Sequence, residues 1–259
     1  MDAALFSAHD VNTPRAAVEG EKTLADGSTL IWGMSRREFG AMTFTNRPEW
    51  DITHNRMQFL RIWDLKVDDV IAPYLDHTAT VAEVGRKDRR KGARELSSAY
   101  RQTDGLITRD TNVVLMTTHA DCLPVWLIAP KGGWIGMLHA GWRGVASGIL
   151  RNAVEKIPEA DREGLTLAIG PGICVDHYEI GQEVADVFLA DSVMSGAVKQ
   201  HGDKLHLNLL EAARLQGEAA GAIVDTSMFA CTFENDYLAS WRRDGESFTP
   251  LAAFITRME

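Results

Sequence analysis

The chain has 259 residues, of which 45% are apolar and 24% charged, a composition typical of a globular protein with a large core. Its formal net charge of −9 argues against general affinity for nucleic acids or anionic membranes. No apolar run exceeds five residues, far fewer than the ~18 needed to cross a bilayer.

The start of the chain and the cysteines indicate a cellular compartment. Met1 to Asp10 has neither a cationic region nor an apolar stretch of secretory length, so we expect a cytoplasmic protein. Cys122, Cys174 and Cys231 are an odd number, and a disulfide framework would need more. We therefore expect free thiols, with Cys174 and Cys231 inert.

Apolar and β-branched runs bounded by Gly, Pro, Asn and Asp predict strands. In chain order these are residues 30–34, 78–84, 113–117, 125–129, 134–138 and 165–169. Apolar positions about four residues apart predict one helix near 145–157, and further helices are predicted near 55–65, 179–190 and 208–221. Asn208 and Glu211 resemble a capping box, and Gly221 is the expected C-cap. No linker or repeat divides the chain, so we expect one α+β domain of mixed sheets over residues 1–259.

Common nucleotide and metal motifs are missing from the sequence. Val175 stands where the third glycine of a Rossmann fingerprint would follow Gly170 and Gly172. The P-loop pattern, H-E-x-x-H and C-x-x-C do not occur.

Two segments carry most of the chemistry, Thr118–Pro124 and His139–Gly144, and each lies at the end of a predicted strand. If these strands pair, Cys122 and His139 converge, as an activated thiolate or as two ligands of a soft metal. The small residues after His139 and the helix start beside Arg143 are typical of an anion site. Taken singly, a strand cysteine and a lone histidine are more often structural.

The strings Thr-His-Ala-Asp-Cys-Leu-Pro and His-Ala-Gly-Trp-Arg-Gly resemble the signature segments of the laccase-domain family. This family is also called YfiH-like or multicopper polyphenol oxidase-like, and its members are regarded as purine nucleoside phosphorylases. Further resemblances occur at residues 33–37, 55–56, 76–78, 104–108, 178–181, 231–232 and 242–245. They extend over about 31–255 and imply the YfiH-like fold, a single α+β domain with helices flanking mixed sheets.

The resemblance implies a catalytic metal held by His77, Cys122 and His139. Two neutral imidazoles and one thiolate suit zinc, with copper as the alternative, and leave a fourth position for water or substrate. In an extended strand His119 faces away from Cys122, so we do not expect it to be a ligand. Asp76 and Thr78 stand where the family usually has an apolar residue and a glycine, which alters the backbone beside His77.

The implied activity is phosphorolysis of adenosine, inosine, guanosine and methylthioadenosine to the base and (methylthio)ribose 1-phosphate, with adenosine deamination as a second activity. Purine nucleosides and inorganic phosphate are then the partners, without nucleic acid or membrane, and the chain is expected to be a monomer or a small homo-oligomer. Motif position suggests that substrate is bound by Ser35, Arg37, Asn55, Arg56 and Arg143.

Several alternatives stay open. In a cysteine hydrolase, Cys122 would be the nucleophile and His139 its base. A polyphenol oxidase would use a single copper, because the chain has only eight histidines and no His-x-His pair. Residues 86–94 hold six Lys/Arg and one Asp, and they form a solvated loop, a flap that collects phosphate or a surface for an acidic partner. Asp121 is a candidate general base, although an orienting role fits equally well.

Overall fold

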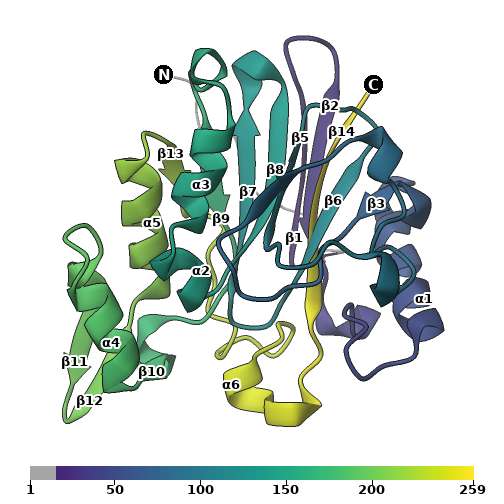
Figure 1. Ribbon diagram of the computed structural model, residues 1–259. Helices are drawn as coiled ribbons and strands as arrows, with labels where there is room; N and C mark the ends of the chain where they lie inside the picture. The colour runs from purple at the N-terminus through teal and green to yellow at the C-terminus, as the bar shows by residue number, and fades with distance from the viewer. Residues whose placement is uncertain (1–15) are drawn as a thin grey trace.

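The computed structural model describes residues 16–259, which form four layers in the order helix, sheet, sheet, helix (Figure 1). The first sheet has the strand order β1 (Val18–Thr23), β2 (Thr29–Met34), β14 (Leu251–Met258), β6 (Val114–His119) and β3 (Val70–Ile71). The second has the order β13 (Ile223–Asp225), β9 (Thr166–Ile169), β7 (Leu123–Ala129), β8 (Trp134–Ala140), β5 (Gly105–Thr108) and β4 (Val81–Glu83). A small third sheet contains β10 (Glu179–Ile180), β12 (Lys204–Leu207) and β11 (Val198–His201).

Helices cover the outer faces of the two large sheets. Helix α1 (Glu49–Leu60) packs on the first sheet. On the second sheet lie α2 (Trp142–Ala146), α3 (Ile149–Lys156) and α5 (Leu209–Ala219). Helix α4 (Gln182–Leu189) accompanies the small sheet, and the short α6 (Trp241–Asp244) lies at the same end of the molecule (Figure 1).

Strand alternation builds the core, because successive side chains of a strand point to opposite faces. In β7, Trp126 and Ile128 pack between the two sheets, whereas Val125 and Leu127 face the helices. The indole of Trp126 donates to the backbone oxygen of Phe254 in β14 at 2.8 Å, which satisfies its buried N–H across the sandwich.

The α+β class with mixed sheets is confirmed, since parallel pairs such as β3–β6 occur beside antiparallel ones. Each predicted strand overlaps an observed one, although residues 78–84 yield only Val81–Glu83. The helix predicted at 55–65 begins earlier, at Glu49, and the one predicted at 179–190 begins at Gln182. Strands β1, β5 and β14 were not among the predicted apolar runs.

The single helix predicted over residues 145–157 is wrong. The chain forms α2 and α3 instead, because Gly148 between them adopts a left-handed conformation with φ of +90°. In α5 the cap is as predicted at one end, where the Asn208 side chain accepts from the Glu211 backbone N–H at 3.0 Å. At the other end Ala220 is the C-cap, and Gly221 follows it with φ of +87°.

The basic run at residues 86–94 is an ordered loop whose cations meet acidic side chains. Arg89 pairs with Asp69 at 2.9 Å, Arg94 with Asp68 at 2.7 Å and Lys91 with Asp88 at 2.8 Å. Because these cations already pair with acidic side chains, residues 86–94 resemble a solvated loop more than a free flap that collects phosphate.

No helix within residues 16–259 is both long and apolar enough to cross a membrane. Met1 to Asp10, on which the expectation of a cytoplasmic protein rested, lies outside the described residues.

We predict that Gly148→Ala lowers the free energy of unfolding by about 1–2 kcal/mol, because an L side chain is strained in the left-handed region. Urea unfolding measures this change. The exposed neighbouring substitution Ser147→Ala is the control and should shift stability by less than about 0.5 kcal/mol. Equal effects of the two substitutions would show that the helix break does not depend on glycine.

Candidate metal centre

Three side chains that are distant in sequence converge at one end of the sandwich. His77 comes from the loop between β3 and β4, Cys122 from the turn between β6 and β7, and His139 from β8. Their ligand atoms lie within 4.8 Å of one another. Antiparallel pairing of β7 with β8 sets His139 opposite Pro124 and so beside the Cys122 turn, the convergence expected from the sequence.

A buried carboxylate, Asp104, holds two of these three residues. Its Oδ1 accepts from Nδ1 of His139 at 2.9 Å and from the backbone N–H of His77 at 3.0 Å. Because an ionised carboxylate only accepts, Nδ1 of His139 carries a proton, and in the neutral ring that a metal would bind, the lone pair is on Nε2. A histidine oriented in this way by a carboxylate is typical of metal ligands.

The His77 loop depends on the same carboxylate. His77 has φ of +58°, a conformation that costs free energy for a residue with a side chain. Asp104 Oδ2 accepts from the backbone N–H of Thr78 at 2.7 Å and from its hydroxyl at 2.9 Å. Thr78, which stands where the family usually has glycine, therefore adds a hydrogen bond that stabilises the loop.

Asp104 is the functional residue that sequence reasoning missed. The resemblance at residues 104–108 assigns no role to Asp104, the acidic residue directly before the buried strand β5. The sequence does contain a signal for Asp104, because an acidic residue at the end of a buried apolar strand needs a hydrogen-bonding or charged partner. That partner, His139, could be identified only once β5 was seen to pair with β8.

The electrostatics of the site favour an ionised thiol. Burial opposes ionisation of Cys122, but the charge of His139 and hydrogen bonds from both histidines outweigh it and lower the pKa of Cys122. Burial likewise opposes protonation of His139, but the charge of Cys122 and the hydrogen bond to Asp104 raise the pKa of His139. A cation placed among these groups would take over the charge that His139 supplies to the thiolate.

The residues fit a metal ion such as zinc in donor type and in space. One thiolate and two imidazoles form a mixed sulfur and nitrogen set of three, so a fourth zinc ligand would come from outside these residues. The Gly141 backbone lies so close to the donors that a Cβ there would be 2.9 Å from the sulfur of Cys122 and 3.2 Å from the His77 ring, a contact that glycine avoids.

His119 and Asp121 brace the Cys122 turn. Both ring nitrogens of His119 are engaged, Nε2 with the Thr117 hydroxyl at 2.8 Å and Nδ1 with the Cys122 backbone oxygen at 3.2 Å. Burial and the charge of His139 hold the pKa of His119 well below its usual value, so this ring stays neutral.

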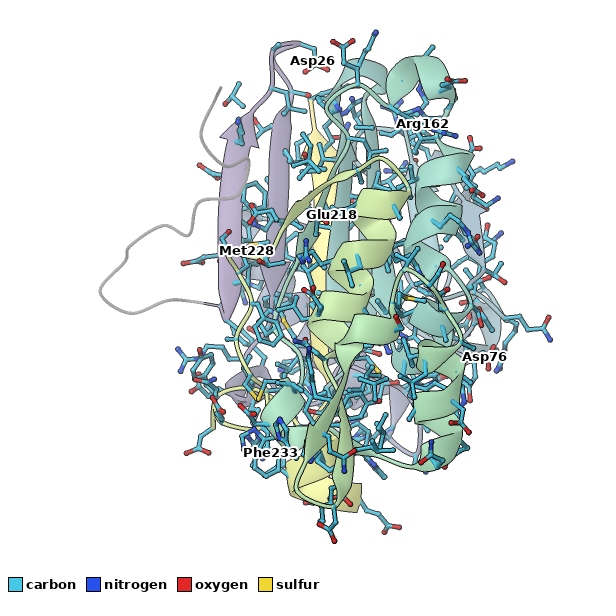
Figure 2. The ribbon with its side chains drawn as sticks, turned by 90° about the vertical axis from the view of Figure 1, so that its left-hand side faces the viewer. Asp26, Asp76, Arg162, Glu218, Met228 and Phe233 are labelled. Atoms are coloured by element: carbon cyan, nitrogen blue, oxygen red, sulfur yellow. The ribbon has the colours of Figure 1, made fainter. Side chains whose placement is uncertain are left out.

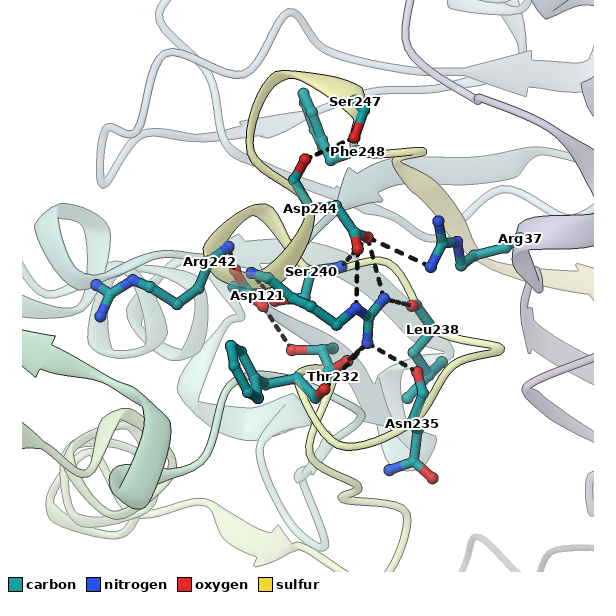
Figure 3. A network of polar contacts seen from close by, with 12 residues as sticks. Arg37, Asp121, Thr232, Asn235, Leu238, Ser240, Arg242, Asp244, Ser247 and Phe248 are labelled. Carbon is teal, nitrogen blue, oxygen red and sulfur yellow. Dashed lines mark hydrogen bonds and ion pairs between the residues drawn. The ribbon is translucent and has the colours of Figure 1, made fainter.

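Asp121 is fixed by two hydrogen bonds to its carboxylate. It accepts from the Thr232 hydroxyl at 2.6 Å and from the Arg242 backbone N–H at 2.7 Å (Figure 3). Its φ of +80° places it in the tight turn before Cys122. These contacts give Asp121 an orienting role.

Three of the five residues predicted to bind substrate make backbone contacts. The Ser35 hydroxyl accepts from the Ala252 N–H at 3.0 Å. The Asn55 amide donates to the Ala41 oxygen at 2.9 Å. Arg56 is buried and donates to the backbone oxygens of Met42, Gly92 and Ala93, although it also lines a small cavity with Tyr74, Leu75 and Thr118. Substrate binding by these three residues stays a prediction.

The other two predicted residues keep accessible guanidinium groups. Arg143 is exposed at the start of α2 and lies over the Trp142 ring, 4.3 Å from its centre. Arg37 pairs with Asp244 at 3.4 Å and is one-third exposed (Figure 3).

Tyr178 and Arg242 lie beside the Cys122 turn. The sequence resemblance includes both residues in its segments but gives neither of them a role. Burial raises the pKa of Tyr178, and the charge of Cys122 raises it further, while Arg242 and Arg143 act in the opposite direction. The Arg242 guanidinium lies 5.3 Å from the centre of the Tyr178 ring. The site therefore combines a soft-metal donor set with an aromatic ring and cationic groups that suit a phosphate.

Comparisons with known proteins show the family and the fold. The family model "Multi-copper polyphenol oxidoreductase laccase" matches residues 32–258. The purine nucleoside phosphorylase YlmD of Geobacillus stearothermophilus is 31% identical over 81% of this chain and 80% of its own length. Adenosine deaminase RL5, from an unknown prokaryotic organism, is 33% identical over 60% of this chain and 61% of its own. The crystal structure of the Geobacillus YlmD superposes with a TM-score of 0.81 and 26% identity, covering 93% of this chain and 100% of that one.

We predict that Asp104→Asn weakens zinc binding at His77, Cys122 and His139 about 10- to 100-fold, because the orienting partner of the His139 ring is lost. Peptide mapping of Cys122 alkylation by iodoacetamide, across a series of buffered free zinc concentrations, reports occupancy of this site alone. The exposed substitution Asp203→Asn should leave the protection curve unchanged. Superimposable curves for all three proteins would rule out a positioning role for Asp104.

Proposed function

Because this chain belongs to the multi-copper polyphenol oxidoreductase laccase family, whose curated relatives include purine nucleoside phosphorylases and an adenosine deaminase, we propose that it is a zinc enzyme of purine nucleosides. It cleaves adenosine, inosine, guanosine and methylthioadenosine with phosphate, giving the base and (methylthio)ribose 1-phosphate. It also converts adenosine and water to inosine and ammonia. The observation that carries the proposal is the convergence of the ligand atoms of His77, Cys122 and His139 within 4.8 Å of one another.

In this proposal each group of the site has a defined task. His77, Cys122 and His139 hold the metal, which supplies a Lewis acid that polarises a substrate atom. Asp104 fixes the tautomer and the orientation of His139.

Phosphate and purine are held by other residues in this proposal. Arg143 and Arg37 position phosphate against the anomeric carbon, where positive charge develops as the glycosidic bond breaks. The half-buried ring of Tyr178, next to the Cys122 turn, offers an apolar surface for the purine.

A cysteine hydrolase is the second candidate, because Cys122, His139 and Asp104 form the nucleophile, base and orienting carboxylate of such an enzyme. The second imidazole on the thiol favours the metal reading, since a Cys-His-Asp triad has no use for His77 at the sulfur. The two candidates differ when the metal is removed. The zinc enzyme loses activity and regains it with zinc, whereas the hydrolase is active without metal and is silenced only by alkylation.

We expect that protein with a known zinc content releases adenine from adenosine only when phosphate is present, and forms inosine with or without phosphate. Chromatography of the products over time measures both reactions. His139→Gln should reduce both rates more than about 100-fold, since a ligand is removed. His54→Gln, on the exposed face of α1, is the matched control and should leave them unchanged.

Other products would decide against this assignment. Absence of both adenine and inosine at full zinc occupancy contradicts the nucleoside activity. Copper as the native metal, together with oxygen uptake on a phenol, would favour a single-copper polyphenol oxidase.

We expect that Arg143→Gln raises the KM for phosphate about 10- to 100-fold, because one charge-assisted hydrogen bond is lost. Deamination, which uses no phosphate, should keep its rate. The exposed substitution Arg151→Gln in α3 removes the same charge further along the chain and serves as control. If Arg143→Gln and Arg151→Gln raised the KM for phosphate equally, the overall positive charge, and not a specific contact of Arg143, would attract phosphate.

A further inference from the structure

A second group of metal-ligating side chains lies apart from the first three. Cys174 directly precedes the single turn Val175–His177 and His177 ends it, whereas Cys231 and Glu234 lie on the segment between β13 and α6. One ligand atom from each of the four residues lies within 4.8 Å of the others. Within each pair the ligands are three residues apart, a spacing that structural zinc sites use.

Three of four distances between these atoms lie in the range of a tetrahedral metal site, and the fourth, 3.1 Å, is slightly shorter. Zinc bonds of ~2.3 Å to sulfur and ~2.0–2.1 Å to nitrogen or oxygen, at tetrahedral angles, place neighbouring ligand atoms about 3.3–3.8 Å apart. His177 Nδ1 lies 3.1 Å from the Cys174 sulfur, 3.7 Å from the Cys231 sulfur and 3.5 Å from Glu234 Oε1. The Cys174 sulfur and Glu234 Oε1 are 3.7 Å apart.

The surroundings hold the donors in place. The backbone N–H of Cys174 donates to the sulfur of Cys231 at 3.4 Å, which fixes the two cysteine segments against each other. The His177 ring stacks on Phe233, with centres 4.2 Å apart and planes 15° apart, so the ring cannot swing freely. Figure 2 places Phe233 at the lower end of the molecule, the end where the small sheet and α6 lie in Figure 1.

The segment that supplies Cys231 and Glu234 is fixed by Arg243. Its guanidinium donates to the backbone oxygens of Thr232, Phe233, Asn235 and Leu238 (Figure 3). Asp244 holds the same guanidinium by two hydrogen bonds of 2.8 and 3.0 Å. A segment organised in this way by a partly buried cation presents its ligands before any metal binds, which reduces the entropy lost on binding.

We propose that Cys174, His177, Cys231 and Glu234 bind a second zinc ion. Four protein ligands close the site, so its role is structural, in contrast to the three-ligand centre at Cys122. The expectation from sequence that Cys174 and Cys231 are inert is replaced by this assignment.

The second ion braces the wall of the first site. Thr232 follows Cys231 directly and donates to Asp121, which precedes Cys122. Tyr178 follows His177 directly and lies near Cys122. Binding at the second site therefore fixes two residues that shape the first.

The test compares the zinc content of the full chain with that of variants in which one of the two metal sites is removed. After zinc loading and dialysis, Cys174→Ser with Cys231→Ser should carry one zinc ion fewer per chain than the unchanged protein. Glu234→Gln should weaken retention, whereas Asp236→Asn, two residues away, serves as a matched control. Circular dichroism and retained zinc protection of Cys122 establish that the double variant is folded.

Cobalt provides an independent readout that does not require the double variant. Cys122→Ser keeps the second site alone, so its cobalt form should show one ion with the charge-transfer band of two thiolates in tetrahedral geometry. Thiol titration of the metal-stripped, denatured chain without reductant should find all three cysteines free.

Two results would overturn the proposal. In the first, Cys122→Ser binds no cobalt and the double variant keeps the full zinc content. In the second, thiol titration finds one free cysteine, which means that Cys174 and Cys231 form a disulfide. Because these measurements follow the second site by itself, they hold whether or not the chain acts on nucleosides.

Discussion

The centre depends on one buried carboxylate and the groups that bind it. Asp104 is fully buried and accepts hydrogen bonds from His139, from the backbone of His77 and from Thr78. A charge in such a place is stable only when several donors surround it, and here the donors are the parts that must be positioned. The hydrogen bonds to Asp104 offset the free-energy cost of burying the carboxylate. The same bonds order the left-handed His77 loop and orient the His139 ring.

The sandwich determines where these groups meet. The turn between β6 and β7 links the two large sheets, so Cys122 lies at their shared lower end, where α2 begins and α6 packs (Figure 1). Gly141 and Asp121 make the turns around it tight enough for the sulfur to reach both imidazoles. Chemistry at this end therefore rests on loops that are held by a rigid core, as is usual for catalytic sites.

Local patterns predicted much of this arrangement, and long-range contacts account for what was missed. The apolar runs predicted the strands on either side of Cys122 and the strand that carries His139, and the two residues converge as expected if these strands pair. The break at Gly148 was not, because an apolar stripe continues across two helices as it would along one. The clustering of Cys174 with Cys231 was not predicted, because 57 residues separate them and contacts such as the pairing of Gly172 with Cys231 join their segments in the fold.

Strand β14 is the last in chain order, yet it lies inside the first sheet, hydrogen-bonded to β2 on one side and β6 on the other. During synthesis both neighbours leave the ribosome well before the strand that joins them, and their facing edges are open until then. Folding of this sheet therefore depends on pairings between segments far apart in sequence, and its two inner edges stay unpaired until β14 joins them.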